Sequence, residues 1–193
     1  VRNHGYEDWG LVNYYSKNIN GDFFENQSVN NNPNLQRNTS YKQKDLIQKF
    51  NFRFSKKARL ILNFQFSESS NINRFDKLTE KNDEGNLKYA EWYYGPQKRS
   101  FISSKLSFQG QRFFDRADII FAYQKIDETR NKRKFGSSIL NIQDENLDIF
   151  SINSDFFKRI DRQESIAYGL EITNNQLNSD GFESLVNSDN LNK

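Results

Sequence analysis

Cysteine does not occur in the 193-residue sequence. The chain therefore has no disulfide, no thiol nucleophile and no cysteine-based metal site. Long apolar runs are missing as well: mean hydropathy is −0.94, and no stretch approaches the ~18 to 20 apolar residues that a transmembrane helix needs. These absences exclude a membrane protein built of helices.

Charge of one sign is also scarce, because 28 basic residues are interspersed with 25 acidic ones and leave a net charge of +3. This pattern predicts no nucleic-acid partner. Histidine occurs only as His4, which has no partner spacing around it. A histidine can ligate haem iron, but we expect His4 to be an exposed polar residue.

Catalytic and cofactor motifs are missing too: the chain has no G-x-S-x-G, no H-E-x-x-H and no phosphate-binding glycine loop. Asp76, Asp83 and Glu84 lack the residue order of a calcium loop. We therefore predict no catalytic residue, no metal, no bound cofactor and no enzymatic activity.

Aromatic residues are abundant, at 15% of the chain with 18 Phe, and many of them recur at every second position. Leu60, Leu62, Phe64 and Phe66 alternate with mostly polar neighbours, which is the period of a strand between two environments. The same alternation predicts seven strands, near residues 9–16, 41–54, 58–67, 98–109, 117–128, 146–157 and 164–173.

The connections alternate between short turns and long polar segments. We expect long loops at residues 17–40, 68–88 and 127–145, and a polar tail from 174 to 193. In an up-and-down meander, all the short turns then lie on one rim, as in a transmembrane β-barrel. Residues 46–54 span roughly 21 Å of membrane normal at a tilt of about 45°, close to the ~25 Å apolar band of such barrels.

Three stretches carry a family resemblance: LKYAEWYYGPQKR (87–99), residues 113–136 and ENLDIFSINSDFFK (145–158). They resemble the barrel of TonB-dependent outer-membrane receptors, with most likeness to the haem, haemoglobin or ferric-siderophore type of Bacteroidota. Residues 3–16 and 69–80 look like earlier parts of the same barrel.

The resemblance implies that residues 1–193 are an antiparallel up-and-down transmembrane β-barrel fragment of about seven strands without the plug. It also implies a place in the outer membrane, contact with outer-membrane lipid, and a TonB complex reached through the missing plug. The complete receptor is then expected to import a small iron-bearing ligand such as haem or a ferric siderophore.

Two pairs of residues are candidate ligand contacts. Trp92 and Tyr93 can stack on a planar ligand, or form part of an interfacial aromatic girdle. Arg130 and Arg133 can attract an anionic ligand, or simply lie in a solvated loop.

Two other functions stay open at this point. One is the same receptor architecture serving a glycan or a peptide, because loops set the ligand. The other is a β-sandwich adhesin or binding module at the cell surface, in which the apolar faces pack on each other.

Overall fold

The computed structural model describes residues 11–17, 23–29 and 39–186, and it is all-β with antiparallel pairing throughout, as the sequence predicts. The elements are β1 (Leu11–Lys17), β2 (Phe23–Val29), β3 (Gln43–Arg53), β4 (Ala58–Ser69), β5 (Ile72–Asn73), α1 (Phe75–Leu78), β6 (Tyr89–Tyr94), β7 (Lys98–Gln109), β8 (Arg116–Lys134), β9 (Ile139–Arg159) and β10 (Ser165–Leu185).

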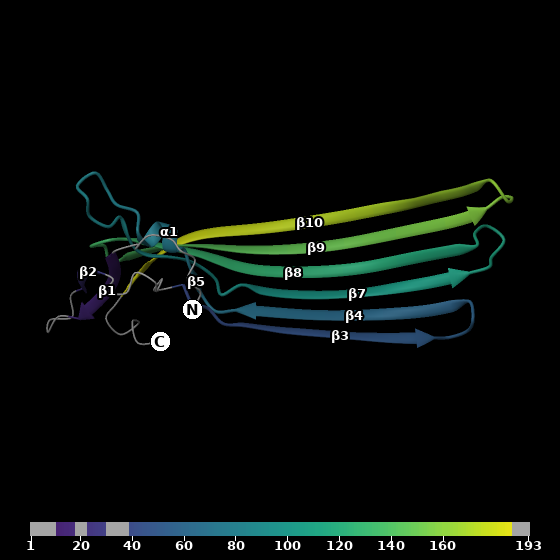
Figure 1. The fold of residues 1–193 in the computed structure, drawn as a ribbon, viewed down its shortest axis with the longest axis horizontal. Helices are drawn as coiled ribbons and strands as arrows, with labels where there is room; N and C mark the ends of the chain where they lie inside the picture. The colour runs from purple at the N-terminus through teal and green to yellow at the C-terminus, as the bar shows by residue number, and fades with distance from the viewer. Residues whose placement is uncertain (1–10, 18–22, 30–38, 187–193) are drawn as a thin grey trace.

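The six long strands form one open sheet in the order β10-β9-β8-β7-β4-β3, so that neighbours in space follow the chain order. Figure 1 shows the short turns 54–57, 110–115 and 160–164 together at one end, which we call the turn end. In the described part of the chain, β3 and β10 are the two edges, and the sheet does not close on itself. Among the strands that the structure describes, β1 and β2 pair only with each other.

Strand register gathers the predicted apolar positions on one face of this sheet. Directly paired residues of an antiparallel ladder share a face, and the ladder pairs Phe50 with Leu62, and Phe121 with Ile152. We call this surface the apolar face. Its large side chains are Leu46, Phe50, Phe52, Leu60, Leu62, Phe64, Phe66, Ile102, Leu106, Phe108, Ile119, Phe121, Tyr123, Phe150, Ile152, Phe156, Ile166, Tyr168, Leu170 and Ile172.

The apolar face has a limited height, which we call the apolar band. Along β4 it runs from Ala58 to Phe66, or about 26 Å at ~3.3 Å per residue. The next row of the same face, toward the end opposite the turns, is polar in all six strands: Lys44, Glu68, Lys98, Asp127, Asn146 and Asn178. The last apolar row is that of Phe66 in β3 and β4, one row nearer the turn end in β7, β8 and β9, and two rows nearer in β10, so the boundary is stepped across the sheet.

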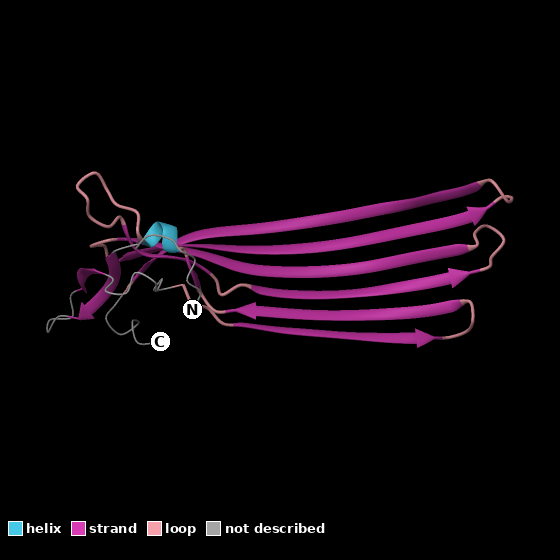
Figure 2. Cartoon of the chain, in the orientation of Figure 1, coloured by secondary structure: helices cyan, strands magenta, loops and turns pink. Residues whose placement is uncertain are grey.

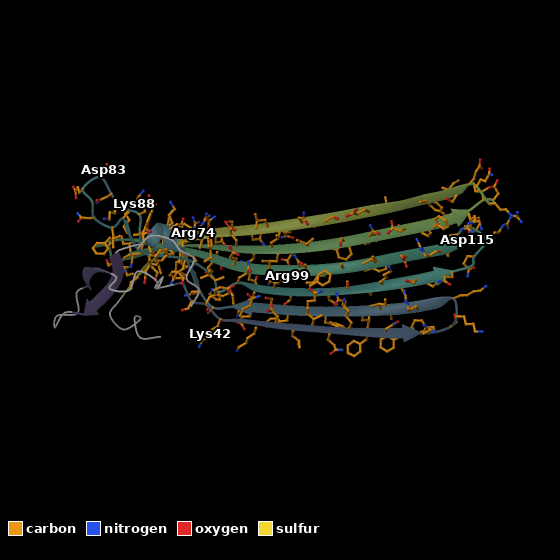
Figure 3. All side chains as sticks on the ribbon, viewed as in Figure 1. Lys42, Arg74, Asp83, Lys88, Arg99 and Asp115 are labelled. Carbon is orange, nitrogen blue, oxygen red and sulfur yellow. The ribbon has the colours of Figure 1, made fainter. Side chains whose placement is uncertain are left out.

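The opposite surface, the polar face, carries cross-strand hydrogen bonds. Arg99 donates to Gln65 at 3.1 Å and to Gln124 at 2.9 Å, which links β4, β7 and β8. Asp118 accepts from Ser107 at 2.6 Å and lies 3.0 Å from the Lys105 ammonium. Figure 3 shows the side chains along these strands without a second layer of chain over them, and Figure 2 shows helix only at one end.

The expected loop at 127–145 and the polar tail from 174 are wrong. β8 and β9 continue through the first segment and are joined by residues 135–138 alone, while β10 reaches Leu185. These stretches contain few apolar residues, and those present do not alternate regularly with polar ones, so the period-two pattern is lost although the strands persist. The expected strands 117–128, 146–157 and 164–173 are consequently too short.

Two further loop expectations need correction. Residues 17–40 contain β2, and residues 68–88 contain β5 and α1. The first predicted strand, 9–16, corresponds to β1, with Trp9 and His4 outside the described residues. Most boundaries of β3, β4 and β7 lie within two residues of those expected.

A β-bulge at residues 95–97 sets the geometry beyond the apolar band. β6 continues the line of β7 along β8, but Lys98 pairs with Asp127 whereas Tyr94 pairs with Arg130. The strand therefore has one extra residue, and its inward and outward positions exchange. Gly95 lies in the bulge and has φ +97°. Its amide donates a hydrogen bond to the Thr129 carbonyl at 2.7 Å, and its carbonyl accepts one from the Thr129 hydroxyl at 2.6 Å.

Candidate functional site

The candidate site lies beyond the apolar band, where β8, β9 and β10 continue and β5, β6 and α1 join them. We call this part the extension. Among the described residues, most buried side chains occur here: Leu78, Leu87, Ala90, Trp92, Asn131, Arg133 and Val186. The six-stranded region has almost none, so the extension is where this chain packs against itself.

Arg133 is fully buried, and its Nε lies 3.1 Å from a carboxylate oxygen of Glu91. Its Nη1 also donates to the carbonyl oxygen of Ser137 at 2.5 Å. A buried cation is tolerated only with such compensation. Arg133 therefore ties β8 to β6 and to the 135–138 turn.

Tyr93 lies on the same face as Arg133. It pairs with Asn131, which is two positions from Arg133 in β8 and therefore on the same side of the strand. Burial raises the pKa of the Tyr93 hydroxyl, helped by the nearby Glu91 carboxylate.

Trp92 lies on the other side of β6, on the polar face, where it pairs with Lys132. Only 8% of Trp92 is exposed. The Arg74 guanidinium carbon lies 4.9 Å from the centre of the Trp92 ring. The Tyr94 ring packs edge-on against Trp92, with ring centres 5.1 Å apart. A planar ligand would have to displace Arg74 before stacking on Trp92.

Arg74 is itself fixed by Asp76, which accepts from Nε at 2.8 Å and from Nη2 at 2.6 Å. Hydrogen bonds to Asp76 and Tyr94 raise the pKa of Arg74, so its charge is permanent.

The segment 74–88 is joined to β6 by the Arg74 amide, which donates to the Trp92 carbonyl at 2.8 Å, and ion pairs brace the segment internally. Glu80 accepts from Lys77 and from Lys88, each at 2.7 Å. Hydrogen bonds from these two ammonium groups lower the pKa of Glu80. Figure 3 shows Arg74, Asp83 and Lys88 at this end of the sheet and Asp115 at the turn end.

The four residues singled out from the sequence thus divide between two faces. Trp92 and Arg130 lie on the polar face, whereas Tyr93 and Arg133 lie on the opposite one. Arg130 and Arg133 are three positions apart in one strand, and a strand places such residues on opposite sides. A single anion site containing both arginines is incompatible with this arrangement.

A hollow of about 370 Å³ lies on the polar face of the extension, between β8, β9 and β10. We call it the rim pocket. Its polar lining includes Arg130, Lys132, Asn141, Gln143, Ser179 and Glu183. Sequence reasoning missed the β9 and β10 members, because polar residues in a polar stretch give no signal of which side they occupy.

In one half of the rim pocket, the polar side chains already bond to one another. Arg130 donates to the Gln143 carboxamide oxygen and lies 3.7 Å from Glu145. Gln143 in turn donates to Glu145 at 2.9 Å and to Ser179 at 3.2 Å. The charge of Arg130 is therefore balanced by neighbouring groups.

The turn end is aromatic and basic. Phe156 stacks on Tyr168 with ring centres 5.1 Å apart, and Phe114 packs 5.6 Å from Phe156. The Tyr168 hydroxyl donates to the Phe113 carbonyl at 3.0 Å. Nearby cations are Lys56, Lys57, Arg112, Lys158, Arg159 and Arg162.

No group of His, Asp or Glu suited to a metal ion occurs among the residues that the structure describes, and no helix within them is long and apolar enough to cross a bilayer. Comparison with known proteins finds no matching family model, curated protein or solved structure. The arrangement itself offers charged and amide groups for binding.

Proposed function

We propose that the six long strands are part of the wall of an outer-membrane β-barrel, and that the complete protein is a TonB-dependent receptor. The observation that carries the proposal is the apolar face, which is continuous over six strands and uncovered. Leu46 is 65% exposed, Leu170 62% and Phe52 46%. Soluble monomers rarely expose apolar patches of more than a few hundred Å².

The dimensions of the apolar band support a lipid contact. Its 26 Å along β4 correspond to about 19 Å of membrane normal at a strand tilt of about 45°, against ~25 Å for known barrels. Polar rows bound it on one side, and the aromatic and basic turn end bounds it on the other. Aromatic rings prefer the membrane interface, and cations prefer anionic headgroups.

A β-sandwich needs a second sheet of comparable size to cover the apolar face. Among the described residues, the only other sheet is the pair β1–β2, with seven residues in each strand. Such a hairpin is too small to cover six long strands. Lipid is therefore the better partner for this face.

The open edges of β3 and β10 fit a wall segment. Unpaired amide and carbonyl groups cannot be left in hydrocarbon, so we expect further strands of the complete receptor to pair with both edges. The polar face then looks into the barrel, and the extension projects beyond the membrane as a place for ligand binding.

The ligand assignment rests on the family resemblance. On that basis, the receptor imports an iron-bearing ligand, haem or a ferric siderophore, with energy delivered through TonB. Deleting its gene should impair growth on haem or ferric siderophores under iron limitation. Undiminished growth on every iron source would remove the iron assignment while leaving the membrane assignment standing.

A peptide is the second candidate ligand, favoured by one feature of the rim pocket. The charge of Arg130 is balanced by Glu145. The pocket also contains Lys132 and Glu183, which have opposite charges and no partner among the described residues. Haem and most ferric chelates are anionic and have little use for an acidic group.

A further inference from the structure

One row of the rim pocket crosses three strands. Lys132 of β8 pairs with Asn141 of β9, and Asn141 pairs with Glu183 of β10. All three side chains lie on the polar face, because directly paired residues share a face. Lys132 and Glu183 are exposed, and Asn141 is half-buried.

These three side chains are available to bond to a ligand. Within the described part of the chain, none of them has a side-chain hydrogen bond or an ion pair, whereas the next row, Arg130 and Gln143, is internally bonded. The row therefore offers one cation, one amide and one anion to a ligand.

The spacing of the row limits what the ligand can be. Strands in a sheet are about 4.8 Å apart, so Lys132 and Glu183, two strands apart, are separated by about 10 Å. The structure contains no ion pair between Lys132 and Glu183, whose side chains start two strands apart. A ligand that contacts both side chains as they stand out from the sheet must carry an anionic and a cationic group roughly 10 Å apart.

An extended peptide of three residues spans at most about 10 Å. Its carboxylate can reach Lys132, its amino group can reach Glu183, and its central amides can bond to Asn141, whose side chain both donates and accepts. A hollow of about 370 Å³ lies in the size range of small-ligand sites.

We propose that the rim pocket binds a short zwitterionic peptide, about three residues long with both ends free, which lies across β8, β9 and β10. The assignment rests on the proposed function, since the pocket is reached from outside only if the extension projects from the membrane. It names the ligand class that the resemblance leaves open.

The test uses the complete protein purified in detergent and four probes: trialanine, N-acetyl-trialanine, trialanine amide and doubly capped trialanine. Equilibrium dialysis or calorimetry gives each dissociation constant. Each cap removes one charge-assisted contact, so each single cap should weaken binding by about tenfold and the double cap by more.

Variants assign each end of the peptide to its residue. Lys132→Met should abolish the preference for trialanine over its amide, and leave the penalty for N-acetylation unchanged. Glu183→Gln should do the reverse. Lys125→Met, in the same strand but on the apolar face, is the matched control and should change neither preference.

Gly181→Leu offers a blocking variant without loss of fold. Gly181 lines the pocket, and a Cβ atom added there meets nothing within 4 Å. The larger side chain should fill the pocket and weaken trialanine binding by at least about tenfold.

Two results would overturn the proposal: no binding of trialanine, or equal affinity for the capped and uncapped peptides. Either result leaves the membrane proposal intact, because that proposal is judged separately by lipid contact at the apolar band. Loss of lipid contact with retained end-dependent binding would instead reject the receptor and keep the peptide site.

Discussion

Replacing Phe121 by lysine places a charge in the middle of the apolar band. Phe121 is 40% exposed on the apolar face. Along β8 it is four residues from Lys125, the first polar residue of this face beyond the band, and five from Arg116, which is about 13 Å and 16 Å at ~3.3 Å per residue. At a tilt of about 45° the depths below the two boundaries are about 9 Å and 12 Å.

A lysine side chain reaches about 6 Å, so the ammonium group at position 121 cannot snorkel to either interface. A lysine on the lipid face near the midplane costs about 2–4 kcal/mol, falling to about 0–1 kcal/mol near an interface. We therefore expect Phe121→Lys to lower the free energy of unfolding from liposomes by about 2–4 kcal/mol. Phe108→Lys, at the turn end of the band, should cost only about 1 kcal/mol.

Ala122→Lys is the matched control, because it is the next residue along β8 and lies on the polar face. Its cost should stay below about 1 kcal/mol if that face is wet. Urea unfolding of the complete protein from phospholipid liposomes measures all three variants. Equal penalties at 108 and 121, or a larger penalty at 122 than at 121, would refute a lipid-facing band.

Three further predictions concern the extension. Gly95→Ala should destabilise it by about 1–2 kcal/mol, since Gly95 has φ +97° and its added Cβ lies 3.1 Å from a backbone carbonyl oxygen. Hydrogen exchange of the extension measures this loss of stability, and Gly181→Ala should be nearly neutral in the same experiment. Arg133→Met leaves the Glu91 carboxylate, which is 22% exposed, without its buried cation and should cost about 3 kcal/mol, the lower end of the range for a buried pair. Arg130→Met, on the half-exposed pocket side, should cost less than about 1 kcal/mol, with both compared by chemical unfolding. The pKa of Glu80 is lowered from its ordinary value of 4.5, so its contacts stabilise segment 74–88 above that pH and are lost as the pH falls through the lowered pKa. The hydrogen-exchange protection factors of residues 74–88, which are corrected for the intrinsic pH dependence of exchange, should fall on that acidification, and a Glu80→Gln variant should lose this fall.

The sheet could be predicted from the sequence wherever one face is apolar. Leu60, Leu62, Phe64 and Phe66 share a side, and the register of β4 with β7 extends that side across the sheet. Alternation of period two carries this information because a shift of one residue would exchange the two environments.

The extension could not be predicted in the same way, because its strands carry polar residues on both sides and lack a regular alternation of apolar and polar positions. Arg130 and Arg133 look like a cluster in the sequence, and the strand separates them. The bulge at residues 95–97 further reverses the sides of β6 relative to β7, so the alternation in β7 gives the wrong side for Trp92. Neither Asn141 nor Glu183 has any local feature that distinguishes it from its neighbours.

The most direct measurement of lipid contact uses the absence of cysteine from the chain. Single cysteines at Leu60, Ile61, Leu62, Asn63, Phe64 and Gln65 of the complete protein, each carrying an environment-sensitive probe, are exposed to a quencher confined to lipid. Quenching should alternate, strong at the three even positions and weak at the three odd ones. Uniformly weak quenching would contradict the membrane assignment and identify the apolar face as a surface covered by protein.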